Sequence, residues 1–342
     1  MPPIPPLTLN RRGLLRQGLS LGLGAALLSP SVRELAAATD DFLRGPPMPD
    51  QPLIRLSPRV AMVYAEDGFP TAENRGMMAN IVFVLTSAGV VVLDTGASVQ
   101  IGEMALRRLR TLTAQPVVAV INSHYHGDHF LGNDAFVQAH GPALPIHAHP
   151  LTWQEIAGTA GNLWRSLMER WTNGATVGTR VVVPNRDLAH GDVLRFGDTT
   201  LRMHHHGVAH TPADICVEVV EDRVVYVGDV AMNGRIANMD DGSYLGTFRS
   251  LAALEQDTRA QLYIPGHGRA SATLLAEQRE LFEGIYRNCE AAVKAGESEA
   301  QAKARVLADA RIQRHAPITK GWDGNIGKYI SLAYLEAEKE AF

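Results

Sequence analysis

Apolar and β-branched runs separated by short polar turns predict strands in the first third of the chain. The runs lie at residues 60–64, 79–86, 90–93 and 117–121. Ser87-Ala88-Gly89 separates the second run from the third, which predicts a hairpin turn there. From residue 98 to 112 apolar residues recur at helical spacing. Strands that alternate with a helix predict an α/β domain.

A second group of elements follows in the same order, after a boundary near residue 185. A short strand at 144–147 and a helix or helix pair at 151–171, interrupted near 158–161, close the first group. The second group contains predicted strands at 199–205, 215–220, 223–227 and 261–264, with a helix at 247–257. The last part reads as helices at 274–294, 298–309 and 326–338. The chain therefore resembles two strand-and-helix halves with a helical extension.

Composition narrows the class of protein. The 342 residues are 46% hydrophobic and 20% charged, and the formal net charge is -4. This is the composition of a globular protein with a full core. No basic run stands out in the body of the chain, so we expect no nucleic-acid partner.

The N-terminus has the pattern of an export signal. The segment NRRGLLR at 10–16 precedes a weakly apolar stretch at 19–28, and small residues follow at 36–38. This resembles a twin-arginine signal peptide, so we expect cleavage near Ala38 and a periplasmic protein. An uncleaved anchor is the alternative, although the apolar stretch is short for a bilayer span. The expected organisation is a signal at 1–38, an extended proline-rich arm at 39–58 and a catalytic domain at 59–342 with a helical C-terminal extension.

Only two cysteines are present. Cys216 lies in the apolar run DICVEVV, and Cys289 is far from it in the sequence. Two buried thiols are expected, with one disulfide as the alternative in an oxidising compartment.

The segment HYHGDH at residues 124–129 concentrates three of the 13 histidines and one aspartate just past a predicted strand. Imidazole and carboxylate groups together are ligands of zinc and other borderline divalent metals. A polar surface loop with histidines is the alternative for a short motif taken alone.

Three later positions continue the pattern. His210 lies in GVAHTPAD, Asp229 in YVGD and His267 in PGHG, and each follows or ends an apolar strand. A lone histidine or Gly-Asp at such a place is usually structural. With the opening motif, however, they bring seven candidate ligands to the ends of successive strands, where α/β sheets commonly place their chemistry.

The order H-x-H-x-D-H, G-x-x-H-T, G-D and P-G-H resembles the metallo-β-lactamase superfamily over residues 60–268. The hairpin at 80–96 is also similar to that family's opening strands. The flank HFLGN at 129–133 and the segment 325–338 look most like periplasmic SoxH-like and quinoprotein-relay-type zinc hydrolases. The resemblance implies a four-layer αβ/βα sandwich with two mixed β-sheets and metals at one edge.

The same resemblance assigns roles to the candidate ligands. His124, His126 and His210 would hold a first zinc ion, Asp128, His129 and His267 a second, and Asp229 would bridge them. A metal-bound hydroxide would then attack the substrate, oriented by Asp128 as the catalytic carboxylate. Thr211 and Asp214 would support the ligands from behind. Asp94, which closes a predicted strand before Thr-Gly, would either hydrogen-bond a ligand imidazole or cap the turn. The family often has Gly-Asp after the third histidine, whereas this chain has Ala213-Asp214.

Aspartate at position 229 bears on the substrate. The lactam-opening branch of the family generally has cysteine or serine at the bridging place, so the resemblance favours a small-molecule thioester, ester or lactone. A β-lactam is the alternative. A different class is an iron-dependent oxygenase or redox protein, or an accessory protein of a periplasmic oxidation system. Zinc is expected rather than iron or manganese, because seven ligands suit a filled pair of sites. We expect no stable membrane span after signal removal, and the sequence does not indicate which protein partner, if any, the chain binds.

Three further features have two interpretations each. His204 and His206 would lie on one face of a strand and His205 on the other, as structural or pocket-lining residues rather than ligands. The loop at 65–78 is either a flap over the substrate or a surface connection. Trp153, Trp164 and Trp171 would share one face of a continuous helix, as core or as a substrate-facing wall.

Overall fold

The computed structural model describes residues 43–66, 68–236 and 239–341. The predicted signal peptide at 1–38 lies outside these residues. Residues Gly45–Phe342 form one compact unit. Within the described ranges, no helix is both long and apolar enough to span a bilayer.

The first sheet has seven strands that follow one another in sequence order. The hairpin-connected strands β1 to β4 pair antiparallel, and β4 to β7 pair parallel. Their bounds are β1 Leu53–Arg55, β2 Val60–Val63, β3 Ile81–Thr86, β4 Gly89–Leu93, β5 Val117–Ile121, β6 Ile146–Ala148 and β7 Arg186–Asp187. The sheet is therefore mixed, and its parallel half carries β5, the strand that precedes HYHGDH.

The second sheet has five strands in the order β12-β11-β10-β9-β8. Only the pair β11 and β12 is parallel. The bounds are β8 Val193–Phe196, β9 Thr199–His204, β10 Cys216–Val219, β11 Val224–Gly228 and β12 Leu262–Pro265.

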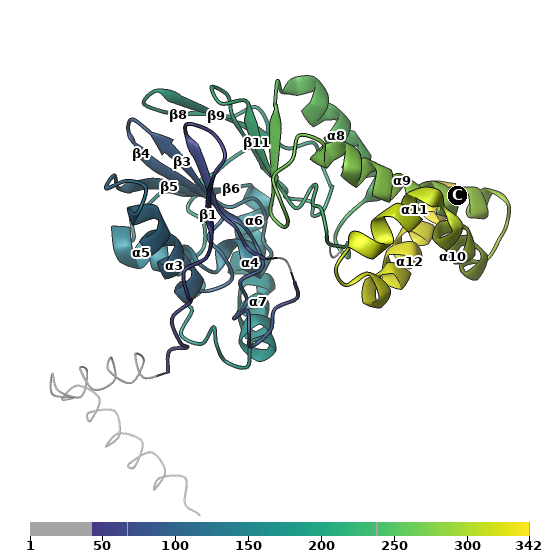
Figure 1. Ribbon diagram of the computed structural model, residues 1–342, viewed down its shortest axis with the longest axis horizontal. Helices are drawn as coiled ribbons and strands as arrows, with labels where there is room; N and C mark the ends of the chain where they lie inside the picture. The colour runs from purple at the N-terminus through teal and green to yellow at the C-terminus, as the bar shows by residue number, and fades with distance from the viewer. Residues whose placement is uncertain (1–42, 67, 237–238, 342) are drawn as a thin grey trace, which may run out of the picture. The chain divides into compact units, whose positions relative to one another are not determined.

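The two sheets pack face to face, and helices cover their outer faces (Figure 1). Alternate residues of a strand point to opposite faces. In β3, Val82 and Val84 face the second sheet, whereas Ile81 and Phe83 pack under the helices α3 Val99–Arg110, α5 Asn133–His140 and α7 Thr159–Trp171. Helix α8 Tyr244–Asp257 covers the second sheet through Leu251 and Leu254. This is the expected four-layer α/β sandwich.

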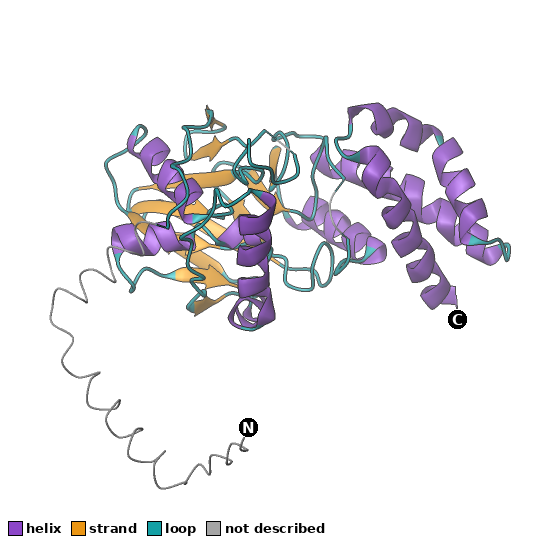
Figure 2. Cartoon of the chain, turned by 90° about the horizontal axis from the view of Figure 1, so that it is seen from below, coloured by secondary structure: helices purple, strands orange, loops and turns teal. Residues whose placement is uncertain are grey.

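The C-terminal helices form a core of their own beside the sandwich (Figure 2). They are α9 Leu274–Lys294, α10 Glu299–Ala308, α11 Ala310–His315, the 3-10 turn η2 Ala316–Ile318 and α12 Trp322–Ala341. Glu336 of α12 joins them to α8, because its carboxylate accepts hydrogen bonds from Ser243 Oγ at 2.6 Å and from Tyr244 N–H at 2.8 Å. Tyr244 also donates from its hydroxyl to Tyr329 O at 2.9 Å.

Most predicted elements are confirmed, and the differences lie mainly in short segments. The arm at 39–58 was expected to be irregular, but Leu53–Arg55 pairs with β2 as an edge strand. The helices α5 and α11 and the strands β7 and β8 were not predicted. The two strands are short and largely exposed, so they lack an apolar run. Helix α6 Pro150–Ala157 ends at Gly158, as the predicted interruption requires. Cys216 and Cys289 are buried free thiols.

Candidate metal centre

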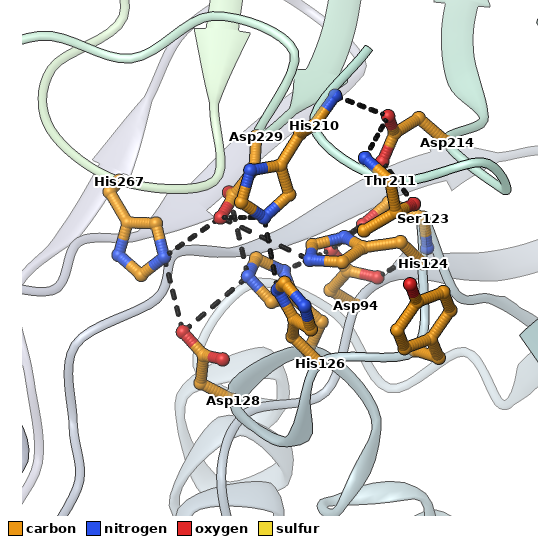
Figure 3. A network of polar contacts seen from close by, with 12 residues as sticks. Asp94, Ser123, His124, His126, Asp128, His210, Thr211, Asp214, Asp229 and His267 are labelled. Atoms are coloured by element: carbon orange, nitrogen blue, oxygen red, sulfur yellow. Dashed lines mark hydrogen bonds and ion pairs between the residues drawn. The ribbon is translucent and has the colours of Figure 1, made fainter. Parts of the chain in front are cut away.

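The motif HYHGDH occupies the turn that leaves β5. His124 lies three residues beyond the strand, and His126 precedes the single helical turn α4 Gly127–Phe130, which carries Asp128 and His129. A helical turn places these adjacent residues in different directions. Asp128 reaches the centre from a different side than His124 and His126 do (Figure 3), and His129 contributes to two of the donor groups there.

The other three candidate ligands come from the second sheet. His210 lies on the loop after β9, Asp229 directly follows β11, and His267 lies two residues beyond β12. The parallel pair β11 and β12 brings Asp229 and His267 to the same edge. The structure therefore brings together all seven side chains that the sequence singled out.

Three imidazoles form the first group. His210 Nε2 lies 3.0 Å from His126 Nδ1, and the ring of His124 stands 4.7 Å from His126 and 5.0 Å from His210, centroid to centroid. One nitrogen of each ring can point to a common place, a geometry able to hold one metal ion. This is the donor set that the sequence predicted for a first ion.

Asp128, His129 and His267 form the second group. His267 Nε2 lies 3.1 Å from Asp128 Oδ2, and His129 Nε2 lies 3.5 Å from the same oxygen. Asp229 lies between the groups: its Oδ2 is 3.5 Å from His210 Nε2 and 3.3 Å from His267 Nε2. A carboxylate in contact with both groups has the position that a bridging ligand requires.

The donor set fits bound metal ions. None of the seven side chains is more than 8% exposed. The buried atoms His124 Nε2, His129 Nε2 and Asp229 Oδ1 have no hydrogen-bond partner within the protein. A buried polar atom without a partner costs free energy, and metal coordination is the ordinary way in which clustered imidazoles and carboxylates avoid that cost.

Electrostatics favour the metal-binding protonation state in only some of the ligands. Burial lowers the pKa of His210 to about 3 and that of His124 well below its usual value, so both imidazoles are neutral at pH 7. Burial alone would raise the pKa of Asp229, but His267 and His129 outweigh it and hold that pKa well below the ordinary value. Neutral imidazoles and ionised carboxylates are the forms that bind metal.

Against the lowering effect of burial, the carboxylates Asp229 and Asp128 raise the pKa of His267 to about 9. The same carboxylates raise the pKa of His129 well above its usual value, so a metal must displace a proton from each of these two rings.

Asp94 holds His129 from behind. It ends β4 in the left-handed region at φ 55°, and its Oδ2 accepts a hydrogen bond from His129 Nδ1 at 2.7 Å. It also accepts from Ser123 N–H at 2.7 Å and from the hydroxyls of Ser123 and Tyr226. A carboxylate on one ring nitrogen fixes the tautomer and leaves the other for a metal. The structure thus gives Asp94 the supporting position that the sequence left open.

Asp214 and Thr211 support the loop of His210 rather than its ring. Asp214 Oδ2 accepts from the N–H groups of His210 and Thr211, each at 2.8 Å, and Asp214 Oδ1 accepts from Thr211 Oγ1 at 2.8 Å. Burial raises the pKa of Asp214 to about 7, against the lowering effect of these donors. The two residues therefore set the backbone conformation from which His210 projects, with alanine at position 213 in place of the more usual glycine.

A close packing of backbone holds His267. Asn80 donates from Nδ2 to Pro265 O at 3.0 Å and Gly268 O at 2.9 Å, on either side of it. A Cβ on Gly266 would lie 2.1 Å from Asp229 Oδ1, so only glycine allows this approach. His267 Nδ1 donates to Met78 O at 2.7 Å, which leaves Nε2 for the centre.

A cavity of about 280 Å³ opens onto the ligands. His126, Asp128, His210, Asp229 and His267 reach its floor, and the aromatic side chains Phe69, Trp164 and Trp171 form one wall. Phe69 stands edge-on to Trp171 at 5.0 Å, and Trp164 lies 4.9 Å from the ring of His126. Trp153 belongs to another helix and donates to Asp187, so the proposed stripe of three tryptophans on one continuous helix is wrong.

The sequence interpretation missed several further residues that line the cavity or lie beside the ligands. Arg235 lies at the cavity, and Lys320, Asn325, Lys328 and Tyr329 reach it from the C-terminal helices. Asp241 accepts from Tyr125 OH at 2.9 Å and lies 3.7 Å from His126 Nε2. These residues are distant in sequence from most of the ligand motifs, so no local sequence pattern pointed to them. The loop at 65–78 contributes Gly68, Phe69, Pro70 and Met78, so it is more than a surface connection.

Comparison with known families agrees with this geometry. The family model of the metallo-beta-lactamase superfamily matches residues 74–267, more than half of the chain. The chain belongs to that superfamily. Its helices after residue 267 lie outside the matched range.

Solved structures share the metallo-β-lactamase fold. A metallo-beta-lactamase from Pontibacter korlensis is 20% identical with a TM-score of 0.55, covering 68% of this chain and 98% of its own. VMB-1 is 17% identical with a TM-score of 0.52, covering 68% and 96%. DIM-1 metallo-beta-lactamase is 15% identical with a TM-score of 0.53, covering 70% and 99%. No curated protein matches.

Proposed function

We propose that this superfamily member is a dinuclear zinc hydrolase that cleaves a thioester, ester or lactone bond in the periplasm. One observation carries the proposal: two groups of buried donors lie side by side, with Asp229 in contact with both. Superfamily members are mostly metal-dependent hydrolases, and this donor set is complete. Iron or manganese is the less favoured occupant, because zinc suits a closed set of imidazoles and carboxylates.

The metal ligands and the cavity wall would have different roles in the reaction. Two zinc ions at these groups would supply a hydroxide nucleophile at neutral pH and polarise the substrate carbonyl. His124, His126 and His210 would hold the first ion, and Asp128, His129 and His267 the second, with Asp229 shared. Asp128 reaches the cavity and can accept a hydrogen bond from the attacking water, which would orient it toward the substrate. Phe69, Trp164 and Trp171 exclude bulk water from one side.

The shape of the cavity favours an apolar acyl group. Trp164 and Trp171 are partly buried against the core and turn their rings to the cavity beside Met168. Such a wall binds hydrocarbon by removing its surface from water. The cationic side chains Arg235, Lys320 and Lys328 also line the cavity and would accommodate a negatively charged part of the substrate. Lys328 Nζ lies 2.6 Å from Asp240 Oδ2, and Lys320 Nζ lies 3.8 Å from Glu66 Oε1.

Aspartate at position 229 favours this proposal over a β-lactamase, because the lactam-opening branch of the family generally has cysteine or serine at that place. Two of the three solved structures are named as metallo-β-lactamases, but identities of 15–20% establish the fold and not the substrate. We therefore keep β-lactam hydrolysis as the alternative. The likeness to SoxH-like and quinoprotein-relay-type hydrolases rests on the flank HFLGN and on the segment 325–338. The periplasmic location rests on the sequence of residues 1–38.

Metal content tests the proposal first. Mature protein purified without added metal should contain about two zinc ions per chain, as a two-metal hydrolase requires, when measured by mass spectrometry. It should then hydrolyse a member of a thioester, lactone, β-lactam and sulfate-ester panel, and the class that is cleaved decides between the first proposal and the alternative. The variant His140→Gln, at the exposed end of α5, is the matched control. Predominant iron, or a single ion, would contradict the dinuclear zinc mechanism and make oxygen consumption the next assay.

A further inference from the structure

A second cluster of histidines lies at the end of β9. His204 and His206 have their rings 6.0 Å apart, and Asp257 at the C-terminal end of α8 completes the group, with His206 Nε2 3.9 Å from Asp257 Oδ2. One donor atom of each residue lies within 4.8 Å of the others. The cavity at the buried ligands is lined by other residues, so this cluster is a separate place in the described part of the molecule.

Strand alternation explains how the cluster forms. His205 turns to the opposite side, where it stacks on His149 with centroids 4.5 Å apart and its Nδ1 donates to Asp214 O at 2.9 Å. His204 and His206 therefore face α8 together, as the sequence predicted. Of the two roles expected for them, structural or pocket-lining, the pocket-lining role does not apply, because neither residue lines the cavity.

His204 is prepared for a metal by a carboxylate behind it. It is 2% exposed, and its Nε2 donates to Glu218 Oε2 at 3.1 Å. Arg202 holds the same Glu218 oxygen at 3.1 Å. With the proton on Nε2, the lone pair of Nδ1 is available, and Nδ1 is buried without a partner. This repeats the arrangement of Asp94 and His129, in which a carboxylate fixes the tautomer of a ligand imidazole.

His206 supplies the second unsatisfied donor. Its Nε2 is also buried without a hydrogen-bond partner. Burial lowers the pKa of both histidines, which keeps the imidazoles neutral and able to bind a metal. His190 packs against His206 at 4.9 Å, but its Nδ1 accepts the N–H of His205 at 3.3 Å and is thereby occupied.

We propose that His204, His206 and Asp257 form a second metal site, for one divalent transition-metal ion of the zinc type. Two imidazoles and one carboxylate suit zinc, copper or nickel, and solvent would complete the coordination because Asp257 is exposed. The ion would tie the end of α8 to the segment that leads into the His210 loop. The proposal does not rest on hydrolytic function, since none of its ligands belongs to the cavity.

Equilibrium dialysis of the full mature chain against zinc tests this site. The wild-type protein should bind one zinc ion more than His204→Gln/His206→Gln, and both should hydrolyse the same substrate at the same rate. Asp257→Asn at the exposed helix end carries little risk of misfolding and should weaken the additional ion at least about tenfold. His140→Gln should bind as many ions as wild type.

Equal zinc binding by the wild type and the double variant would overturn the proposal. So would an unchanged affinity in Asp257→Asn, which covers the case in which the double variant fails to fold. Absence of hydrolysis in all proteins, together with loss of one ion in the variants, would contradict the proposed function and leave this site supported. The two proposals therefore fail separately.

Discussion

The buried centre and the second cluster use the same kinds of donor in different settings. In the centre, seven ligands are at most 8% exposed, and they come from both sheets. In the second cluster, His204 is buried, but the side chain of Asp257 is 45% exposed. The donors of this cluster come from the end of β9, the segment just after that strand and the end of α8. The first setting buries every ligand at the end of a cavity, whereas the second leaves one face open to solvent.

The difference lies in the support behind the ligands. Asp94 fixes His129, Met78 O fixes His267, and Asp214 shapes the loop of His210. The second cluster has one such partner, Glu218 behind His204. Outer partners of this kind hold ligand geometry in place. The buried centre is therefore arranged for chemistry that needs fixed positions, and the second cluster for binding that tolerates exchange with solvent.

The largest effect should come from Asp128→Ala, which removes a carboxylate of the buried centre that also reaches the cavity. Hydrolysis should fall by more than about 100-fold, beyond what loss of an outer partner causes. The group formed by His124, His126 and His210 does not include Asp128, so much of the first zinc ion should remain bound. Turnover on the panel substrate and zinc per chain measure both. Asp323→Asn, on the exposed first turn of α12, is the control, and wild-type-like turnover in Asp128→Ala would remove this residue from the mechanism.

A smaller loss should follow Asp94→Asn. The amide retains the size of the side chain but lacks the charge that pairs with His129 Nδ1 and the capacity to accept from all of its present donors. Zinc affinity of the His129 group should fall by about 10- to 100-fold, measured by competition with a chelator. Asp50→Asn, which alters a surface pair with Arg107, should leave affinity unchanged. An Asp94→Asn protein with wild-type affinity would show that the carboxylate is structural only.

The contrast between the two clusters also explains how much the sequence predicted. HYHGDH and the strand-end residues His210, Asp229 and His267 could be assigned because ligands at the ends of apolar strands converge wherever the strands form sheets. Asp257 could not, because it lies about 50 residues from His204 on an exposed helix end and resembles any surface aspartate.

The cavity wall was unpredictable for the same reason. Lys328 and Tyr329 reach the cavity only through the packing of α12 on α9 and its hydrogen bonds to α8. The centre of the sandwich, by contrast, follows from local patterns, because the strands β2 to β5 carry buried apolar residues on both faces. Long-range packing is therefore what separates the predicted fold and ligands from the unpredicted pocket.

Glu218→Gln tests whether the second cluster binds zinc independently of the buried centre. Glutamine at this buried position keeps the volume of the side chain but weakens the hold on His204 Nε2 and on Arg202. The additional zinc ion should bind about tenfold more weakly, while hydrolysis and the ions of the buried centre stay as in wild type. Dialysis and turnover on the same preparation separate the two effects. Glu221→Gln, near the exposed end of the same hairpin, is the matched control. A loss of hydrolysis that matches the loss of zinc would mean that the two clusters are coupled.

The smallest effect should come from His206→Gln in metal-free protein. His206 Nε2 has no hydrogen-bond partner to lose, and the ring is only partly buried. The free energy of unfolding in urea with a chelator should therefore stay within about 0.5 kcal/mol of wild type. With excess zinc, the wild type should gain stability that the variant lacks, by about 2.7 kcal/mol when zinc exceeds the dissociation constant of this site 100-fold. If zinc stabilises the variant as much as it stabilises the wild type, the zinc-dependent gain in stability comes entirely from the buried centre. A variant already destabilised without metal would give His206 a packing role, because only packing contributes when no ion is bound.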